Sequence, residues 1–467
     1  MGIRDNFRLA SPVDLQPQPA AIEQSLFGGT MDGKFTYQQV IDAERRCLRG
    51  KSETMEAREY VNAFYAECYQ VWCELNSRTY APSRFIAFIK PQPVIREVFA
   101  SKFRDRGVDT LIVQRLLPLL EQYFVDDNYS TRVGKGTLYG VRRIAQMIYD
   151  ESEGYTKPCW VLQIDIWSFF MSLSKKIACQ LWRDFLDRFY AGSDRELLLH
   201  TICVILNDRP ELHCTRKGPI SNWDPLPRHK SLFGSDGTHG LPIGKVLVQM
   251  TALLYLAELD IILAWQWGVP HNGHYMDDRS LVHQSREHLL AVKQKIDAWH
   301  QSRELMTHPN KTKLIDYRRG VKFAGAMILP GRTYQLNSTI AKCYRKLHYY
   351  NEMASADPSY VMTHLDDFAA TMNSYFGLLC QHAEWNTTQR IIRNIGSEWF
   401  QVMCILKRRG CRHNLVVQPF TAFSTTAKAR KMLGERMKHY GIPLTCRYRV
   451  RQSLRTFDPR QLFRYAA

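Results

Sequence analysis

Two adjacent aspartates between short apolar arms constrain this chain more than any other feature of its sequence. Asp277 and Asp278 follow Tyr275 and Met276, and short apolar segments with aromatic flanks lie on both sides. The pattern predicts a β-hairpin that carries two carboxylates at its tip. Alone it is a weak signal, because such a short pattern occurs by chance in roughly a few per cent of proteins and Asp-Asp is common in solvated turns.

A second carboxylate ends a strand pattern far upstream. The apolar run 160–164 predicts a buried strand, which is followed by Asp165 and the start of a helix. An acid at the end of a buried strand is costly unless it is paired or binds a metal ion, although helix capping is an alternative role. The intervening chain is long enough for two helices and a loop to return the hairpin to this strand. Converging carboxylates of this kind select magnesium or manganese.

The charge of the chain favours a polyanionic partner. The 467 residues carry a formal net charge of +18, which suits neutralisation of nucleic-acid phosphates. Solubility alone, or adhesion to an anionic membrane, is the alternative. The beginning of the chain lacks the apolar core of a signal peptide, and Gln249, Glu258 and Asp260 interrupt the most apolar run, 246–265. We therefore expect a buried helix there, no membrane association and a cytoplasmic protein.

The cysteines argue against a zinc or redox protein. The chain contains 12 cysteines, none of which forms a Cys-x-x-Cys pair. Neither a zinc ribbon nor a dithiol redox motif is therefore predicted. The simplest interpretation is a set of reduced thiols, most of them buried.

Three blocks in a fixed order resemble the palm motifs of bacterial retroelement reverse transcriptases. They are residues 165–170, 240–249 and 275–278, and the resemblance covers roughly residues 60–390. It implies an α+β fold with right-hand polymerase architecture: fingers, a palm of antiparallel sheet plus helices, and a helical thumb. The expected parts are an N-terminal extension (1–55), fingers (56–150), palm (151–330), helical thumb (331–400) and a basic C-terminal extension (401–467).

The resemblance implies RNA-directed DNA synthesis by nucleotidyl transfer with two Mg²⁺ or Mn²⁺ ions. Asp165, Asp277 and the backbone carbonyl of Ile166 would hold the metals, with Asp278 supporting them. Lys311, in the block 310–313, would be the general acid that protonates the departing pyrophosphate. The implied catalytic residues are therefore Asp165, Asp277, Asp278 and Lys311.

Four residues are implied in nucleotide binding. Phe170 falls at the position of the steric gate, where an aromatic ring would clash with a 2′-hydroxyl and so select deoxynucleotides; a core aromatic is the alternative. Arg96 is the first choice for the triphosphate contact and Lys90 the second, because cationic side chains suit phosphates. Gln249 ends the second palm block and completes the set.

Further residues are implied in contacts with nucleic acid: Arg104, Arg106, Lys135, Tyr275 and Gly325. Structural ion pairs are an equal alternative for the two arginines, and an ordinary flexible loop is the alternative around Lys135. Gly325 belongs to the expected primer-grip hairpin, in which Ala324 replaces a more usual leucine.

The second palm block resembles one branch of the family. Ile243-Gly244 and Val248-Gln249 resemble the reverse transcriptases of diversity-generating retroelements and the related defence-associated lineages, although Lys245 stands where asparagine is usual. Diversification and antiphage defence both remain open. Either role implies a structured noncoding RNA as template, a cDNA product, deoxynucleoside triphosphates and an accessory protein or self-association. The alternative is a non-catalytic RNA-binding scaffold, which the retained carboxylates disfavour.

Overall fold

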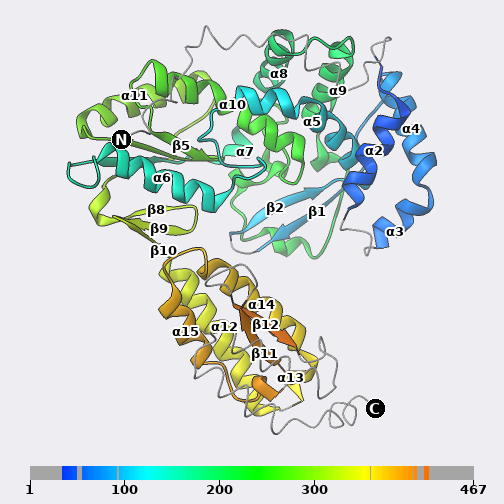
Figure 1. The fold of residues 1–467 in the computed structure, drawn as a ribbon. Coiled ribbons are helices and arrows are strands. Elements are labelled where there is room, and N and C mark those ends of the chain that lie inside the picture. Colours follow the sequence, from blue (N-terminus) through cyan, green and yellow to red (C-terminus); the bar gives the residue numbers. More distant parts are fainter. Residues whose placement is uncertain are drawn as a thin grey trace, which may run out of the picture. The chain divides into compact units, whose positions relative to one another are not determined.

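The computed structural model describes residues 34–49, 55–91, 94–357, 359–401, 403–407 and 415–419. The chain divides into two compact units, shown in Figure 1. The first contains residues 1–147 and 157–314, and the second contains residues 148–156 and 315–467. Most of the expected N-terminal and basic C-terminal extensions lie outside the described residues. The expected division into five parts stays a prediction.

The first unit combines helices with two sheets. Its helices are α2 (Tyr37–Leu48), α3 (Met55–Asn62), α4 (Phe64–Asn76), α5 (Phe103–Tyr123), α6 (Thr137–Glu151, which continues into the second unit), α7 (Phe169–Ser172), α8 (Lys175–Phe189), α9 (Arg195–Asn207), α10 (Val246–Trp265) and α11 (Arg286–Ser302). Short 3₁₀ helices follow α9: η1 (Pro210–Leu212), η2 (Ile220–Trp223), η3 (Arg228–Lys230) and η4 (Leu232–Gly234).

The strands form a three-stranded and a four-stranded sheet. The strands are β1 (Phe85–Lys90), β2 (Arg96–Ala100), β3 (Trp160–Ile164), β4 (Cys214–Arg216), β5 (Asn272–Tyr275), β6 (Asp278–His283) and β7 (Lys313–Asp316). The sheet orders are β2-β1-β4 and β5-β6-β3-β7. Strands β3 and β6 are antiparallel, with Leu162 opposite Leu281, so strands far apart in the sequence become neighbours. Helix α11 packs against β3 and β6, and α10 packs against β5.

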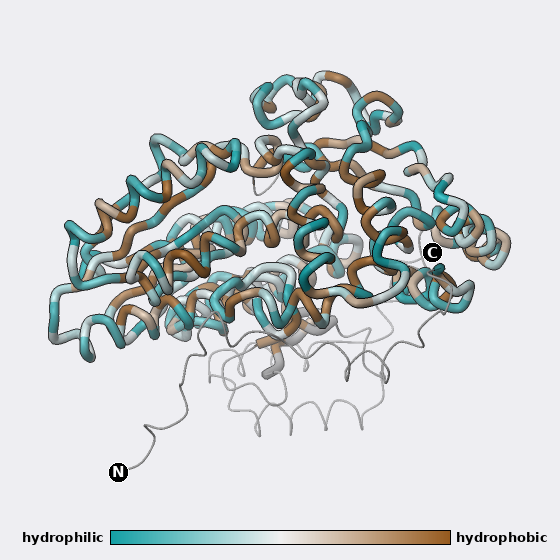
Figure 2. The backbone as a smooth tube through the Cα atoms, turned by 90° about the horizontal axis from the view of Figure 1, so that it is seen from above, coloured by the Kyte–Doolittle hydropathy of each residue, from teal (hydrophilic) through white to brown (hydrophobic). Residues whose placement is uncertain are grey.

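The expected buried helix at residues 246–265 is confirmed as α10. Among the described residues it is the one helix that is long and apolar enough to cross a membrane, yet 72% of its most apolar window is buried inside the protein. A helix that is apolar on all sides suits the centre of a core. Figure 2 shows that hydrophobic and hydrophilic stretches instead alternate along most other described helices, as amphipathic elements require.

Local sequence explains where several elements begin. Thr36 and Gln39 form a reciprocal capping box at the start of α2, which satisfies otherwise unpaired amides. Strands β1 and β2 form an antiparallel hairpin. Helix α5 begins at Phe103. Its first turn is stabilised by buried contacts, since Phe103 and Asp105 are both buried.

The second unit contains a small sheet, a helical core and a strand pair. Its elements are η5 (Tyr317–Arg319), β8 (Val321–Phe323), β9 (Ala326–Leu329), β10 (Arg332–Gln335), α12 (Asn337–Ala356), α13 (Tyr360–Thr363), α14 (Leu365–Leu379), α15 (Trp385–Arg393), η6 (Trp399–Gln401), β11 (Met403–Lys407) and β12 (Leu415–Pro419). Trp399 stacks on Phe368 with ring centroids 3.9 Å apart. Helices α12 to α15 lie within residues 331–400, the range expected for a helical thumb, whereas β11 and β12 lie beyond it and were not anticipated.

Candidate active site

The hairpin predicted around the two aspartates is confirmed as β5 and β6. Tyr275 lies opposite Asp278 in the strand register, so Met276 and Asp277 form a two-residue turn. Met276 has a φ of 56°, a left-handed conformation that two-residue hairpin turns require and glycine or asparagine normally supplies. The turn places Asp277 at the tip of the hairpin.

The strand-end aspartate lies beside this tip. Asp165 follows β3. The last residue of β3, Ile164, pairs with Arg279, which comes directly after Asp278 in the sequence. The Asp165 carbonyl accepts a hydrogen bond from the His308 amide at 2.7 Å, and the Trp167 amide donates to the Met306 carbonyl at 2.8 Å. Because successive residues of an extended segment point their backbone groups to opposite edges, the Ile166 carbonyl faces the other edge, where β6 lies.

The three aspartates, which we call the aspartate tip, repel one another. Burial and then the neighbouring carboxylates of Asp278 and Asp165 together raise the pKa of Asp277 to about 6. The pKa of Asp278 is also raised, first by the protein atoms that crowd its carboxyl group and then by Asp165, although the residue as a whole is exposed. Like charges held this close favour a cation among them.

Lys311 supplies a cation at this place. Its Nζ lies 2.7 Å from Oδ2 of Asp165, and its side chain remains 54% exposed.

The described residues contain no group of three or more His, Cys, Asp or Glu side chains arranged to hold a metal ion. The assignment of Asp165, Ile166, Asp277 and Asp278 as metal ligands therefore stays a prediction.

A second charged group lies beneath the hairpin, and the sequence did not reveal it. Asp260 of α10, His274 of β5 and Arg279 of β6 are all buried; we call them the buried ion cluster. Oδ1 of Asp260 lies 2.6 Å from Nη1 of Arg279, and Oδ2 lies 3.1 Å from Nε2 of His274. Burial would raise the pKa of Asp260, but His274 and Arg279 hold it below its usual value.

The buried ion cluster reaches the turn itself. Nδ1 of His274 donates to the Met276 carbonyl at 2.9 Å. Since a carbonyl and a carboxylate are both acceptors, the ring can donate to Met276 and Asp260 together only when both nitrogens carry hydrogen. The cluster thus fixes the backbone that presents Asp277. Its one visible sequence signal was Asp260, one of two acids within a largely apolar helix.

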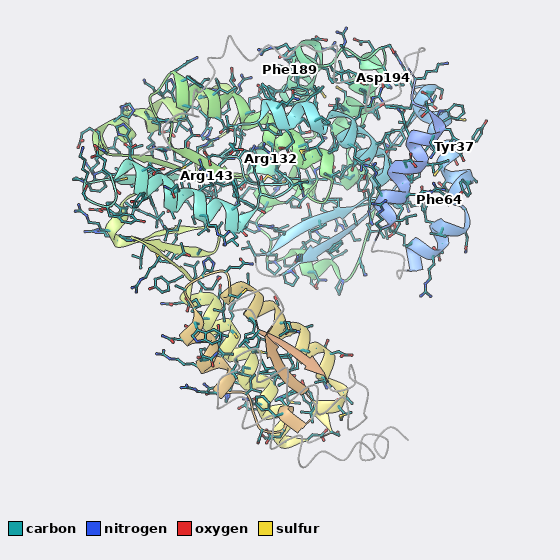
Figure 3. All side chains as sticks on the ribbon, viewed as in Figure 1. Tyr37, Phe64, Arg132, Arg143, Phe189 and Asp194 are labelled. Atoms are coloured by element: carbon teal, nitrogen blue, oxygen red, sulfur yellow. The ribbon has the colours of Figure 1, made fainter. Side chains whose placement is uncertain are left out.

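The segment before α6 braces the same hairpin. The Tyr129 amide donates to the His274 carbonyl at 3.0 Å, and a Cβ at Gly273 would lie 2.1 Å from the Tyr129 hydroxyl. Figure 3 labels Arg132 and Arg143, which hold this segment. Arg132 donates to the carbonyls of residues 125 and 128, and Arg143 forms a two-pronged pair with Asp127. These two arginines were also missed by the sequence analysis.

The two cations expected to meet a triphosphate lie opposite each other. Lys90 ends β1 and Arg96 begins β2, and the two residues are partners in the strand register. Both are exposed. Like charges directly opposite in a sheet are destabilising, so this pair is an unfavourable arrangement for the hairpin alone and a suitable one for an anionic ligand.

Three predicted nucleic-acid contacts are engaged in ion pairs within the protein. Arg104 pairs with Glu74, and Arg106 lies 3.8 Å from Glu56, which is the structural alternative expected for both. Lys135 lies 2.8 Å from Asp126, and its side chain is 11% exposed. Contacts of these residues with nucleic acid stay predictions.

The remaining predicted residues lie in different surroundings. Gln249 accepts a hydrogen bond from the Thr131 hydroxyl at 3.2 Å, which links α10 to the segment before α6. Phe170 is half-buried and packs against the main core, and Tyr275 is half-buried at the end of β5. Gly325 belongs to the second unit, where it forms the β8–β9 turn with Ala324, both at positive φ.

A comparison with protein families adds independent information. The family model described as reverse transcriptase (RNA-dependent DNA polymerase) matches residues 90–328, just over half of the 467 residues. This chain belongs to the reverse transcriptase family. The match contains Asp165, Asp277 and Asp278, and it confirms the expected α+β polymerase fold with right-hand architecture. It does not distinguish the bacterial branches.

Two solved telomerase structures show partial likeness to this reverse transcriptase. Apo telomerase from Candida tropicalis, truncated from its C-terminal domain, has 12% identity and a TM-score of 0.40, covering 55% of this chain and 56% of that one. Telomerase from Candida albicans with a TWJ fragment of telomeric RNA has 8% identity and a TM-score of 0.39, covering 75% and 64%. The chain thus spans less than two thirds of either telomerase chain. A comparison with curated proteins finds no match.

Proposed function

We propose that this protein is an RNA-directed DNA polymerase that copies a dedicated structured RNA into cDNA, in a bacterial diversity-generating retroelement or an antiphage defence system. The observation that carries the proposal is the aspartate tip within the family match: Asp165 at the end of β3 raises the pKa of both hairpin aspartates. A non-catalytic scaffold would have no use for carboxylates held in mutual repulsion.

The donor set fits divalent cations. Asp165, Asp277, Asp278 and the Ile166 carbonyl offer hard oxygen atoms, which Mg²⁺ and Mn²⁺ prefer. When bound, two such ions would neutralise charge at the attacking 3′-hydroxyl and at the triphosphate. The repulsion among the three carboxylates is the feature of this chain that a cation would relieve.

The protein's own residues would bind the substrates and move one proton. Lys90 and Arg96 would bind the triphosphate at the end of the β1–β2 hairpin next to the connecting turn. Lys311, whose Nζ pairs with Asp165, would be the proton donor for the departing pyrophosphate. Phe170 would restrict the space next to the sugar and exclude a 2′-hydroxyl.

The direct test uses the purified full chain with its co-purifying RNA. Incubation with Mg²⁺ and labelled deoxynucleotides is expected to give a DNA product that requires RNA. Absence of any product, together with tight RNA binding, would support the scaffold alternative. Phe170→Ala is expected to increase ribonucleotide incorporation, and unchanged sugar selectivity would remove Phe170 from the gate role.

Sequencing of the cDNA made in cells separates the two biological roles. Copies that are mutated at adenines would support diversification. Repetitive or untemplated products, combined with protection against phage, would support defence. In either case a single noncoding RNA is expected to co-purify with the protein and to be the template.

A further inference from the structure

A cavity of about 360 Å³ lies beside the segment that carries Asp165. Two stretches of the first unit line it, residues 167–172 around α7 and residues 228–239 from the segment between α9 and α10. We call residues 208–240 the linking segment. The cavity volume lies at the lower end of the range for ligand pockets, about 300–1,000 Å³. This cavity is large enough for one small ligand.

The cavity lies on the opposite face of α7 from the core. Trp167, Ser168, Met171 and Ser172 line it, and this spacing puts them on one face of the helical turn. Phe169 is buried on the other face, where Phe170 packs against the same core. The cavity is therefore separate from the predicted sugar gate, although both belong to the segment that follows Asp165.

The linking segment is firmly held at this place. Glu97 of β2 is buried and accepts hydrogen bonds from the Trp223 indole, the Ser231 hydroxyl and the Leu232 amide, all between 2.7 and 2.8 Å. Further along the segment, the Lys175 amide donates to the Thr238 carbonyl at 3.0 Å. The wall of the cavity is thus tied both to the β1–β2 hairpin and to the start of α8.

The lining combines aromatic rings, a cation and a hydroxyl that lacks a partner. The ring of His229 stacks on Trp167 with centroids 4.6 Å apart and planes at 27°. Arg228 precedes His229 and is exposed. The Ser168 hydroxyl is buried without a hydrogen-bond partner among the described residues, and Ser168 has a φ of 47°. Buried polar atoms normally have partners, so a ligand atom would complete this site.

Acidic groups nearby are already engaged. Asp236 accepts hydrogen bonds from the Thr238 amide at 2.8 Å and the His239 amide at 3.3 Å. The His239 ring lies 2.7 Å from Glu304. Asp236 also lines the cavity and is exposed, so the lining carries its carboxylate as well as the cation of Arg228. A phosphate is therefore expected at the Arg228 side of the cavity and away from Asp236.

We propose that this cavity binds a nucleotide, with its base on the ring of His229, which is itself stacked on Trp167, its phosphate at Arg228 and a polar atom at the Ser168 hydroxyl. Stacking of bases on aromatic rings and phosphate contacts with arginine are how proteins bind unpaired strands. We favour an unpaired nucleotide of the RNA over a free mononucleotide. This choice rests on the proposed function, because it takes RNA as the partner.

The test measures how much binding depends on the base. Short fluorescent oligo(rA) and an abasic RNA of the same length are titrated onto the full chain without divalent ions or deoxynucleotides. The readout is the ratio of the two affinities. His229→Ala is expected to lower this ratio about tenfold, whereas His229→Phe retains a ring and restores it. Arg228→Ala is expected to make the slope of log affinity against log salt concentration shallower by about the amount of one phosphate contact.

Lys230→Ala is the matched control. Lys230 belongs to the same short helix and is exposed, but it does not line the cavity. This variant is expected to weaken both RNAs equally and to leave the ratio unchanged. Equal ratios for the native protein and His229→Ala, or no recovery with His229→Phe, would overturn the proposal. Unchanged thermal unfolding of each variant verifies that the fold is intact.

Two further experiments are needed. The first distinguishes an RNA strand from a free mononucleotide as the ligand, and the second distinguishes the cavity proposal from the proposed function. Adenosine 5′-monophosphate that displaces oligo(rA) in a His229-dependent manner would identify a site for free mononucleotides, and failure to compete would identify a site for the RNA strand. Primer extension is measured separately. A base-dependent effect of His229 in a protein that makes no DNA would refute the proposed function alone; extension without that effect would refute the cavity alone.

Discussion

The two charged groups on the β5–β6 hairpin are built on opposite principles. In the aspartate tip, three carboxylates face one another and one half-exposed lysine. In the buried ion cluster, a single carboxylate meets an arginine and a histidine and is fully enclosed. One hairpin thus carries carboxylates that repel one another where it meets solvent, and it contacts a carboxylate held by two partners where it meets the core.

The difference separates residues that we expect to stabilise the fold from residues that we expect to bind a ligand. A buried charge is tolerated only when partners surround it, so the cluster can support the hairpin unaided. The tip has one cationic partner, Lys311 beside Asp165, and the repulsion among its three carboxylates persists in the folded protein. We therefore expect substitutions at the two places to change different quantities.

The largest expected effect on activity comes from the tip. Asp277→Asn is expected to reduce primer extension at least about 1,000-fold, because removing one metal ligand forfeits several kcal/mol of transition-state stabilisation. The same variant is expected to unfold at a higher temperature, since it removes a carboxylate that its neighbours repel. Thermal unfolding and primer extension measure the two effects. Retained DNA synthesis would refute the mechanism. A large loss of stability would contradict the expected difference between the aspartate tip and the buried ion cluster.

The cluster is expected to dominate stability. Asp260→Ala leaves Arg279 buried without its carboxylate, so we expect the free energy of unfolding to fall by about 3–5 kcal/mol. Glu258→Ala is the control, because Glu258 lies on the same helix and pairs with Arg303 at the surface, with 45% of its side chain exposed. The control is expected to lose less than about 1 kcal/mol. Chemical denaturation measures both, and equal losses would show that burial is irrelevant here.

A buried carboxylate elsewhere sharpens the comparison. Glu44 of α2 is fully buried against α5, where a Cβ at Gly107 would lie 2.0 Å from its carboxyl carbon. Burial raises the pKa of Glu44 to about 9 from 4.5, with Tyr60 opposing and Asp105 adding to the shift. Like the aspartate tip, it is a carboxylate whose surroundings disfavour its charge.

This shift predicts a pH dependence with a definite sign. Between pH 4.5 and about 9 the unfolded chain loses the Glu44 proton and the native protein keeps it, so stability falls as pH rises. Glu44→Gln is expected to remove this slope and to raise the free energy of unfolding at pH 7 by up to about 3 kcal/mol. Asp42→Asn, at an exposed position of the same helix, is the control. Parallel pH profiles for native protein and Glu44→Gln would contradict the prediction.

The smallest expected change in stability is at Lys311. Because the Lys311 side chain is 54% exposed, its pair with Asp165 is expected to contribute less than about 1 kcal/mol to folding. Lys311→Ala is therefore expected to leave thermal unfolding almost unchanged. Its extension rate is expected to fall about 100-fold if Lys311 is the general acid. Lys313→Ala, exposed two residues further on, should leave both quantities unaltered. A strong loss of stability at Lys311 would instead place it among the structural cations.

Local pattern was a reliable guide wherever one segment contained the whole signal. The alternation around residues 275–278 predicted the hairpin, and the continuous apolar run predicted α10. The same reasoning could not assign partners to charges. Arg104 pairs with Glu74, and Lys135 pairs with Asp126, although their sequence contexts equally suited contacts with RNA. An ion pair depends on which segments become neighbours, and no single segment records that.

The sequence by itself determined the family, the order of the three palm blocks and the chemical character of the aspartate tip, because these follow from residue type and spacing. Only the tertiary structure decided that Asp260, His274 and Arg279 form one buried cluster and that residues 167–172 and 228–239 enclose a cavity. Both arrangements join segments that are distant along the chain. Both arrangements are stabilised by burial and by contacts between particular side chains, which form only after the strands and helices have packed.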